Sequence, residues 1–382
     1  YSDNMAMAAS VLERFGTEET IAFFASLGLM VRERRGYLYP VSEQAAVVLD
    51  VLRYGLEREG ITVLTQAFVK EIAPMRRDEP DILRRQARRI KDSACQGYLL
   101  RLHNKDNIWA KRVILACGGQ AAPKTGSDGS GYELARFLGH HVIPPVPSLV
   151  QLHCGEKYCK ALAGVRAEGV VRICLDEDSK ADSLQDCICR EAGEIQFTEY
   201  GISGIPVFQL SGSVNQLLAQ ERKLRAEIDF FPQYEEKDYE QLCRQRLENL
   251  KGQTVETFFT GMLHKKIMNV CIRQAGLASE QKADGADRQR LRQVFALCRR
   301  LPFTITGSHP FDSAQVCRGG VSLQEVDSLL QSKCSPGLYL AGELLNVDGR
   351  CGGYNLQWPG PAGILRERRQ DWPVRRRKGS KF

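Results

Sequence analysis

The 382-residue sequence lacks several features that would point to a membrane, a metal centre or a disulfide framework. No apolar run is long enough to cross a bilayer as a helix. Thirteen cysteines are present, but none has the Cys-x-x-Cys spacing of a zinc site. No histidine stands at ligand spacing from the close pairs Cys154/Cys159 and Cys187/Cys189. We therefore expect no metal, no membrane association, and free thiols in a reducing cytoplasm.

Regular interleaving of basic and aromatic residues is also lacking. The formal net charge is +7, and the basic residues concentrate in the segments 76–91 and 366–381. Nucleic-acid-binding surfaces usually combine basic with aromatic side chains on one face. We therefore predict solvated faces and no nucleic-acid partner. A nucleic-acid role is the alternative that charge alone suggests, and its signature would be a weak, strongly salt-dependent affinity.

Glycine, in contrast, is abundant where apolar runs end. The apolar run Leu338–Ala341 has the length and composition of a strand, and a glycine-rich loop with two acids follows it. Glycines let backbone N–H groups approach a ligand closely, and a helix that starts after the loop points free N–H groups at it. The carboxylates would accept hydrogen bonds from sugar or ribityl hydroxyls, whereas a tight surface turn is the alternative. The candidate binding residues are Gly342, Glu343, Asp348, Gly352, Gly353, Asn355 and Leu356.

A second glycine-rich strand end lies in the first third of the chain. The runs 67–73, 97–103 and 109–116 predict three strands, and the turn residues 104–107 join the last two as a hairpin. The third run ends in Ala116-Cys117-Gly118-Gly119, where the glycine pair lets the backbone pass close to a ligand. The segment 124–140 is another glycine loop that enters a helix; an ordinary loop with Ser130 as N-cap is the alternative there.

Two helices and a strand are predicted before these runs. Thr17 as N-cap, acids in the first turn and Gly28 as a stop define the first helix. Ser42 caps the second, whose apolar residues recur at helical spacing until Gly60. The next four residues, 61–64, have strand composition.

The chain changes character after a proline-rich stretch at 143–152, which we interpret as a domain boundary. Short runs rich in valine, isoleucine and phenylalanine predict an all-β subdomain from 149 to about 230. The segment 231–300 is helical in composition, so a small helical subdomain lies within the β subdomain or after it. From residue 301 the chain turns back towards the first domain. The prolines and basic residues of 359–382 predict a disordered tail.

These motifs together resemble the NAD(P)/FAD-dependent oxidoreductases of the YhiN/BaiN kind, also described as aminoacetone-oxidase-type FAD-binding enzymes. The strongest match is GLYLAGE followed by DGRCGGYNLQW within 337–358. GEIQFTEYGISG at 193–204 and FFASLG at 23–28 match as well. Glu199 stands where the family has histidine, and Cys317 stands where threonine is usual.

The resemblance implies an α/β fold with a Rossmann-like FAD-binding domain of the glutathione-reductase type. That domain comprises 1–148 and 309–358, and an inserted β-barrel and a small helical subdomain occupy 149–308. Members of this family begin with a βαβ unit whose glycine fingerprint binds the FAD pyrophosphate. No strand-GxGxxG-helix unit precedes Gly16, so we expect this chain to be a fragment without that unit.

The resemblance also implies a flavin-dependent oxidoreductase that uses FAD, with NAD(P)H as co-substrate. Flavin N5 would carry a hydride to a small unsaturated or carbonyl substrate. We predict no catalytic acid or base; His309 is a candidate proton donor whose alternative is a loop residue before proline. A binding protein without turnover, or a truncated product without flavin, is the alternative function. Besides the C-terminal set, the residues implied to contact FAD are Val69, Ala116, Gly118, Gly119, Gly319 and Gly320.

Overall fold

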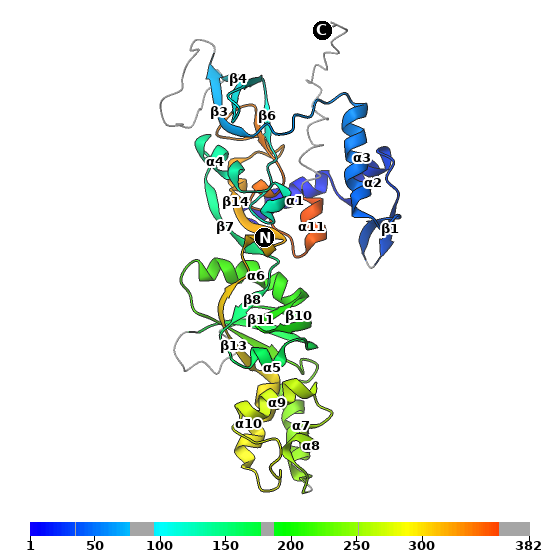
Figure 1. Cartoon of the computed structure of the whole chain (residues 1–382), viewed down its shortest axis with the longest axis vertical. Helices are drawn as coiled ribbons and strands as arrows, with labels where there is room; N and C mark the ends of the chain where they lie inside the picture. The colour runs from blue at the N-terminus through cyan, green and yellow to red at the C-terminus, as the bar shows by residue number, and fades with distance from the viewer. Residues whose placement is uncertain (35, 77–94, 177–186, 251, 359–382) are drawn as a thin grey trace. The chain divides into compact units, whose positions relative to one another are not determined.

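The computed structural model describes residues 1–34, 36–76, 95–176, 187–250 and 252–358 (Figure 1). The chain forms two compact units: unit 1 contains Tyr1–Pro145 and Val316–Phe382, and unit 2 contains Val146–Gln315. The sequence predicts the inserted part at 149–308, so unit 2 extends beyond this range at both ends. The predicted tail at 359–382 and most of the basic segment 76–91 lie outside the described residues.

Unit 1 is built around a parallel pair of short strands. β6 (Val113–Leu115) pairs with β15 (Leu338–Leu340), with Leu338 opposite Val113 and Leu340 opposite Leu115. These four side chains are at most 7% exposed, as expected for parallel strands covered on both faces. The same core contains residues of α1 (Met5–Arg14) and α4 (Ser130–Phe137). Residues far apart in sequence therefore share one core.

A three-stranded antiparallel meander, in the order β3-β4-β5, belongs to the same unit. Its strands are β3 (Val69–Arg76), β4 (Cys95–Leu102) and β5 (Asn107–Ala110). The predicted hairpin turn is confirmed: the Asn104 side-chain amide donates to the Asp106 carboxylate at 2.8 Å. The prediction of one strand over 109–116 was wrong. The chain turns between β5, which pairs with β4, and β6, which pairs with β15, so the run divides between two sheets.

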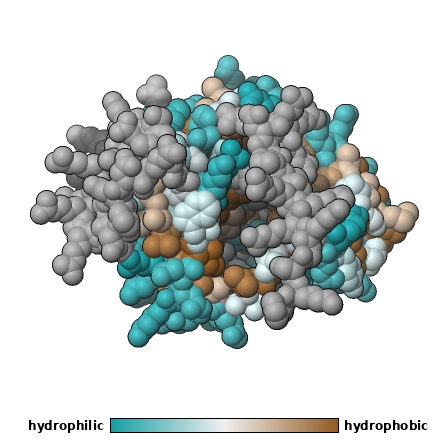
Figure 2. Space-filling model, turned by 90° about the horizontal axis from the view of Figure 1, so that it is seen from above, coloured by the Kyte–Doolittle hydropathy of each residue, from teal (hydrophilic) through white to brown (hydrophobic). Residues whose placement is uncertain are grey.

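A lobe of two helices and a hairpin precedes the meander. It contains α2 (Thr17–Ser26), β1 (Val31–Arg34), β2 (Tyr37–Pro40) and α3 (Ala45–Arg58). Neither helix has a buried residue, so this lobe contributes little to the core. In the end-on view of Figure 2, apolar residues lie among hydrophilic ones, and some of them gather near the middle of the visible face.

The boundaries of these helices differ from the prediction in detail. The N-cap of α2 is Gly16, whose N–H donates to the Glu19 carboxylate at 2.8 Å, and not Thr17. The N-cap of α3 is Gln44 and not Ser42. Residues 61–64 do not form a strand: no neighbouring strand pairs with them in the described part of the chain, and their apolar side chains are more than 50% exposed.

Unit 2 contains a closed barrel in the strand order β10-β11-β8-β13-β12-β9. Every strand places alternate side chains in the barrel core, in keeping with the period of two in β structure. The strands are β8 (Leu152–Cys154), β9 (Arg166–Leu175), β10 (Cys187–Thr198), β11 (Gly201–Gly204), β12 (Leu224–Asp229) and β13 (Leu301–Ser308).

The helical part of unit 2 lies between two barrel strands in sequence. Among the described residues, four α-helices separate β12 from β13. The shorter α5 (Cys159–Leu162) and the longer α6 (Ile205–Leu218) lie between earlier strands. The helices are therefore inserted between barrel strands. The helical subdomain lies within the β subdomain and not after it. The expectation that the chain leaves unit 2 at residue 301 was wrong, because β13 pairs with both β12 and β8 and closes the barrel. The four helices are α7 (Glu236–Glu248), α8 (Val255–Phe259), α9 (Lys265–Gln274) and α10 (Arg288–Arg299).

A buried ion-pair network joins the barrel to the helices. The Asp229 side chain is fully buried at the end of β12. Arg172 of β9 donates to its carboxylate at 2.8 Å, and Arg299 of α10 donates at 3.2 Å. The Phe231 backbone N–H donates to the other carboxylate oxygen at 2.9 Å. One carboxylate thus connects a strand, a helix and the turn after β12.

We expect Asp229→Asn to lower the free energy of unfolding of unit 2 by about 3–5 kcal/mol, because two arginines would lose their buried counter-charge. Glu194→Gln is the matched control, since Glu194 forms an exposed pair with Arg166 on the same barrel at 3.3 Å. That change should cost less than about 1 kcal/mol. Urea unfolding followed by far-UV circular dichroism measures both. Equal losses in the two variants would contradict the structural role of Asp229.

Candidate functional site

Two glycine-rich loops meet where the parallel strands of unit 1 end. β6 leads into residues 116–119, and β15 leads into the short helix η5 (Gly342–Leu344). The Ala341 N–H donates to the Leu115 carbonyl at 2.9 Å, so the two chain segments stay paired up to the loops. Parallel strands bring their carboxyl ends to one edge of a sheet, and ligands of open α/β sheets bind there. Both predicted loops therefore lie at the same edge.

Gly119 and Glu343 face each other across this edge. A Cβ atom on Gly119 would lie 3.0 Å from Glu343 Oε1 and 3.1 Å from Cys317 Sγ, which is too close for an unshifted side chain. Glu343 Oε1 also accepts the Cys317 backbone N–H at 2.7 Å. Burial raises the pKa of the Glu343 carboxyl and raises the pKa of the Cys317 thiol to about 12. The structure thus brings the predicted residues Gly119 and Glu343 together and places Cys317 beside them.

Tyr132 is a further member of this group that the sequence did not indicate. A Cβ atom on Gly119 would lie 3.1 Å from its hydroxyl. The hydroxyl is buried beside the Cys317 thiol, and burial raises the pKa of Tyr132 well above its ordinary value. In sequence Tyr132 is one residue of an amphipathic helix, α4, and no local signal distinguishes it from a core residue.

Gly319 and Gly320 lie where three backbone segments pass close together. Both belong to β14 (Val316–Val321), which pairs with β7 (Val142–Ser148), and their φ angles are +111° and +117°. A Cβ atom on Gly319 would lie 2.6 Å from the Pro144 carbonyl oxygen, and one on Gly320 would lie 2.7 Å from the Leu344 carbonyl oxygen. Packing alone therefore requires both glycines, and their predicted contact with flavin stays a prediction.

Asp348 forms a buried ion pair that the sequence did not predict. Its side chain is 2% exposed, and Arg318 Nε and Nη2 each donate to Asp348 Oδ2 at 3.0 Å. The Arg318 guanidinium also lies over the Tyr1 ring, 4.5 Å from its centroid. A carboxylate held in this way anchors β14 to the loop that precedes α11 (Gly352–Gln357). The predicted contact of Asp348 with a cofactor hydroxyl stays a prediction.

The start of α11 is organised by the Asn355 side chain. Its amide donates to the carbonyls of Gly349 and Cys351 at 3.0 and 2.9 Å, and its oxygen accepts the Gly349 N–H at 2.9 Å. Asn355 therefore holds the glycine loop against the helix. Next to it, Leu356 is 81% exposed, and Gly353 is exposed as well. An exposed apolar side chain beside a glycine loop is a surface that a ligand can cover.

The remaining predicted residues lie around the same edge or away from it. Gly118 and Gly342 have positive φ angles of +74° and +73°. The Gly342 carbonyl accepts from the Trp358 indole at 3.1 Å. Ala116 is exposed directly after β6, and Gly352 at the start of α11 is partly buried. Val69 lies in β3, opposite Leu102 of the meander, and so on a different sheet.

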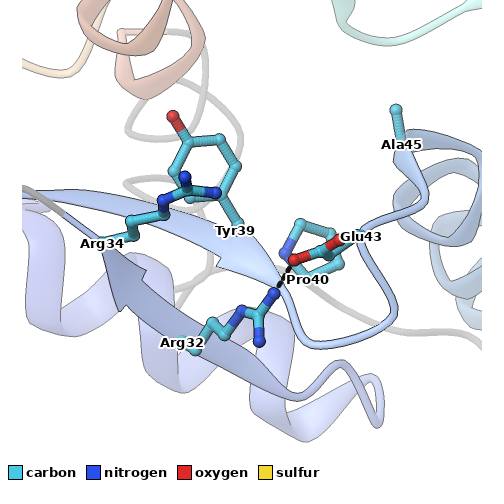
Figure 3. A pocket seen from close by; sticks show the side chains of 6 residues that line it. All are labelled: Arg32, Arg34, Tyr39, Pro40, Glu43 and Ala45. Carbon is cyan, nitrogen blue, oxygen red and sulfur yellow. Dashed lines mark hydrogen bonds and ion pairs between the residues drawn. The ribbon is translucent and has the colours of Figure 1, made fainter.

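A pocket of about 270 Å³ lies elsewhere in unit 1, on the β1–β2 hairpin and the start of α3 (Figure 3). Figure 3 shows Arg32 paired with Glu43, while Arg34 and Tyr39 lie along the hairpin. None of the predicted cofactor residues lines it. Because most of its walls are exposed side chains of a hairpin, we do not assign it to the chemistry.

A group of side chains around the buried His140 in unit 1 contains residue types that bind metals, but the His140 ring contacts other protein groups. Among the described residues, ligand atoms of His140, Glu325 and Cys334 lie within 4.8 Å of one another. His140 Nδ1 is 3.1 Å from Glu325 Oε2, and His140 Nε2 is 2.8 Å from Ser332 Oγ. Both ring nitrogens are thus engaged within the protein. We interpret the group as a polar network that ties the end of α4 to the loop before β15.

The residues at the shared edge fit a large polar cofactor. Asn346 Oδ1, two residues after η5, is buried and lacks a protein partner in the described part of the chain. Buried polar atoms are usually satisfied, so this atom indicates a ligand or ordered water. The glycine loops add backbone that can be approached closely.

Comparison with known proteins identifies the family. A family model described as the HI0933-like protein Rossmann domain matches residues 1–365. This chain belongs to the HI0933-like Rossmann family. A 3-dehydro-bile acid delta(4,6)-reductase from Clostridium scindens is 37% identical over 366 residues, covering 96% of this chain and 83% of that protein. Ribosomal RNA dihydrouridine synthases from Haemophilus influenzae and Escherichia coli are 26% and 24% identical, covering 94% of this chain and 80% of each protein.

Membership of the HI0933-like family, which is FAD-binding, confirms the predicted resemblance. It also confirms the fold class, since the chain combines a Rossmann-family domain with a closed barrel and inserted helices. The prediction of an oxidoreductase is confirmed as well, because the relative from Clostridium scindens is a reductase. No helix in the described ranges is both long and apolar enough to span a membrane.

We expect Gly320→Ala to destabilise unit 1 because its Cβ would meet the Leu344 carbonyl in addition to straining a positive φ. Gly126→Ala is the matched control: its φ of +105° is similar, but nothing lies within 4 Å of the added Cβ. The control should cost about 1 kcal/mol. Gly320→Ala should cost about 1–3 kcal/mol more. Urea unfolding followed by tryptophan fluorescence measures both, and equal losses would contradict the close approach.

The raised pKa of Glu343 predicts a pH-dependent stability. The folded-state pKa lies above the ordinary value of 4.5, so the folded chain binds more protons than the unfolded chain above that pH. The contribution of Glu343 to the free energy of unfolding therefore falls as pH rises from 4.5 towards the folded pKa. Glu343→Gln keeps an acceptor for the Cys317 N–H but removes the titration. The difference between wild type and variant, measured by urea unfolding at several pH values, should decline with rising pH; parallel curves would contradict it.

Proposed function

We propose that this chain binds FAD and uses NAD(P)H to reduce a carbon–carbon double bond conjugated to a carbonyl group in its substrate. The observation that carries the proposal is the shared edge of β6 and β15, where two glycine loops place Gly119 against Glu343. Ligands of open α/β sheets bind outside the carboxyl ends of the strands. The family membership supports a flavin at this edge.

The residues that would hold FAD are those of the two loops and of the α11 start. Residues 116–119 supply backbone without bulky side chains, and Gly352 and Gly353 supply backbone at the helix start that a ligand can approach closely. The raised pKa lets the Glu343 carboxyl hold a proton closer to neutral pH than an exposed glutamate does. When bound, FAD supplies hydride chemistry at flavin N5, and the protein supplies position and electrostatics.

The substrate class is supported by the chemistry that the relatives' names share. One name specifies reduction of a 3-dehydro bile acid at delta(4,6), and the others specify dihydrouridine formation in ribosomal RNA. The uracil ring and an unsaturated ketone both contain a carbon–carbon double bond conjugated to a carbonyl. The carbonyl withdraws electrons, so the distant carbon of the double bond accepts a hydride. A common type of reaction therefore fits both kinds of relative.

A small unsaturated ketone is our first candidate substrate, since the relative with the highest identity among these three acts on a bile acid. Uridine in RNA is the second candidate. It is favoured by two relatives named as ribosomal RNA dihydrouridine synthases and by the net charge of +7. The sequence pattern had favoured no nucleic-acid partner, and we keep the small-molecule substrate as the proposal.

The test is a visible absorption spectrum of the purified chain after incubation with FAD and desalting. We expect retained flavin bands that bleach when NADH or NADPH is added under anaerobic conditions. The bands should return on addition of androstenedione, a conjugated ketone, and not with its saturated counterpart androstanedione. Unmodified ribosomal RNA in a parallel sample distinguishes the second candidate.

A variant pair connects this test to the proposed edge. Gly119→Leu places a side chain against Glu343 and Cys317, and we expect it to lose FAD. Gly126→Leu points into open space and should keep it. Absence of flavin retention in the wild-type chain would favour the flavin-free alternative. Retention by Gly119→Leu equal to that of wild type would place the flavin elsewhere.

A further inference from the structure

The pocket on the β1–β2 hairpin contains two arginines whose positive charges are only partly balanced. Arg32 forms an ion pair with Glu43. Arg34 has no ion-pair partner in the described part of the chain. One positive charge therefore remains for an anion to neutralise. The walls of the pocket, drawn in Figure 3, are Arg32, Arg34, Tyr39, Pro40, Glu43 and Ala45.

Both arginines share one face of the hairpin with two tyrosines. The strand register places Arg32 opposite Tyr39 and Arg34 opposite Tyr37. Directly opposed side chains of an antiparallel pair lie on one face, and so do residues two apart along a strand. Tyr37 and Tyr39 are 45% and 46% exposed, so much of each ring is accessible. Each arginine therefore has an accessible aromatic ring opposite it.

This combination of side chains suits a phosphate group attached to an adenosine. A guanidinium donates two parallel hydrogen bonds to a phosphate, and a tyrosine ring stacks on a base. In dinucleotide sites an acid accepts from the ribose 2′-hydroxyl, whereas an arginine accommodates a 2′-phosphate. Here the only acid of the pocket walls, Glu43, is already bound to Arg32, and Arg34 adds a second cation. The phosphorylated ribose is therefore favoured.

The size of the pocket limits the ligand to part of a dinucleotide. Its volume is about 270 Å³. Pockets that enclose a whole drug-sized ligand have volumes of roughly 300–1,000 Å³. An adenosine phosphate is about half of a nicotinamide dinucleotide, so the other half would lie outside the pocket.

Tyr37 connects this face of the hairpin to the start of α11. Its hydroxyl lies 3.5 Å from Cys351 Sγ, and a Cβ atom on Gly353 would lie 3.2 Å from its ring. Cys351 is the N-cap of α11, and Gly353 belongs to its first turn. A molecule that extends from the pocket over Tyr37 therefore reaches the glycine loop of the candidate cofactor site.

We propose that Arg34 and Tyr39 bind the 2′-phosphate and the adenine ring of NADPH, so that the hairpin pocket selects NADPH over NADH. This proposal rests on the proposed function, which leaves the choice between the two nucleotides open. Arg32, held by Glu43, adds positive charge beside the phosphate. Arg34 and Tyr39 are binding residues and take no part in hydride transfer.

The test is isothermal titration calorimetry of the full chain with 2′,5′-ADP and with 5′-AMP. These two nucleotides differ only in the 2′-phosphate. We expect 2′,5′-ADP to bind about tenfold more tightly or better, because the phosphate adds charge-assisted hydrogen bonds. NADPH should displace 2′,5′-ADP at lower concentration than NADH does.

Two variants separate the phosphate contact from the adenine contact. Arg34→Gln should weaken binding of 2′,5′-ADP about tenfold and leave 5′-AMP unchanged, whereas Tyr39→Ala should weaken both nucleotides alike. Arg53→Gln and Tyr54→Ala are the matched controls, since both residues are exposed on α3 and line no part of the pocket. Both controls should bind as wild type does. A loss confined to one nucleotide cannot come from misfolding.

Two results would overturn the proposal directly. One is a wild-type chain that binds 2′,5′-ADP no more tightly than 5′-AMP. The other is an equal effect of Arg34→Gln and Arg53→Gln on 2′,5′-ADP. A short single-stranded RNA is the third probe. If it binds more tightly than 2′,5′-ADP and Arg34→Gln abolishes that binding, the pocket is an RNA contact and not a site for NADPH.

Calorimetry requires neither flavin nor turnover, so this proposal and the proposed function fail separately. A flavin that NADH and NADPH bleach equally, in a chain that does not distinguish 2′,5′-ADP from 5′-AMP, would remove the NADPH site and leave the reductase function standing. Selective binding of 2′,5′-ADP by a chain that retains no FAD would keep the nucleotide site and remove the flavin function.

Discussion

The parallel pairing of β6 with β15 is the constraint on which unit 1 depends. The Val113 N–H donates to the Gly337 carbonyl at 3.1 Å, and the Ala341 N–H donates to the Leu115 carbonyl at 2.9 Å. All of unit 2 lies between these strands in sequence. Because loop-closure entropy grows only slowly with length, an independently packed insertion of this size is tolerated. The pairing then brings both glycine loops to one edge.

Much of the fold was predictable because strand-length apolar runs and glycines recur where buried parallel strands end. The predicted runs 109–116 and 338–341 contain β6 and β15. The division of 109–116 between two sheets was not predictable, because a strand's partner is a tertiary property. Residues 61–64 show the same limit: they have strand composition, but no neighbour pairs with them in the described ranges. Propensity is a weak prior when a segment is this short.

The glycines of the candidate site could be predicted from the sequence, but the side chains that lie against them could not. A glycine in the sequence indicates that another group lies close to the backbone, but it does not identify that group. At Gly320 the group is the Leu344 carbonyl. Cys317 and Arg318 gain their roles only when β14 lies beside residues 343–348. Those contacts join positions about 26 to 30 residues apart, so no local pattern records them. The sequence therefore indicates the edge of β6 and β15 but not the side chains that meet there.

The buried carboxylates of the two units differ in whether an arginine lies beside them. Asp229 and Asp348 each meet arginine, and such pairs hold elements together. Glu343 accepts a backbone N–H, and within the described ranges no lysine or arginine lies at ion-pair distance from it. Burial without a counter-charge raises its pKa, and perturbed carboxyls of this kind concentrate at functional sites. A fold that needed Glu343 only for stability would gain from a paired or apolar residue there. The buried carboxyl without a counter-charge therefore supports the proposal that a ligand binds at the edge of β6 and β15.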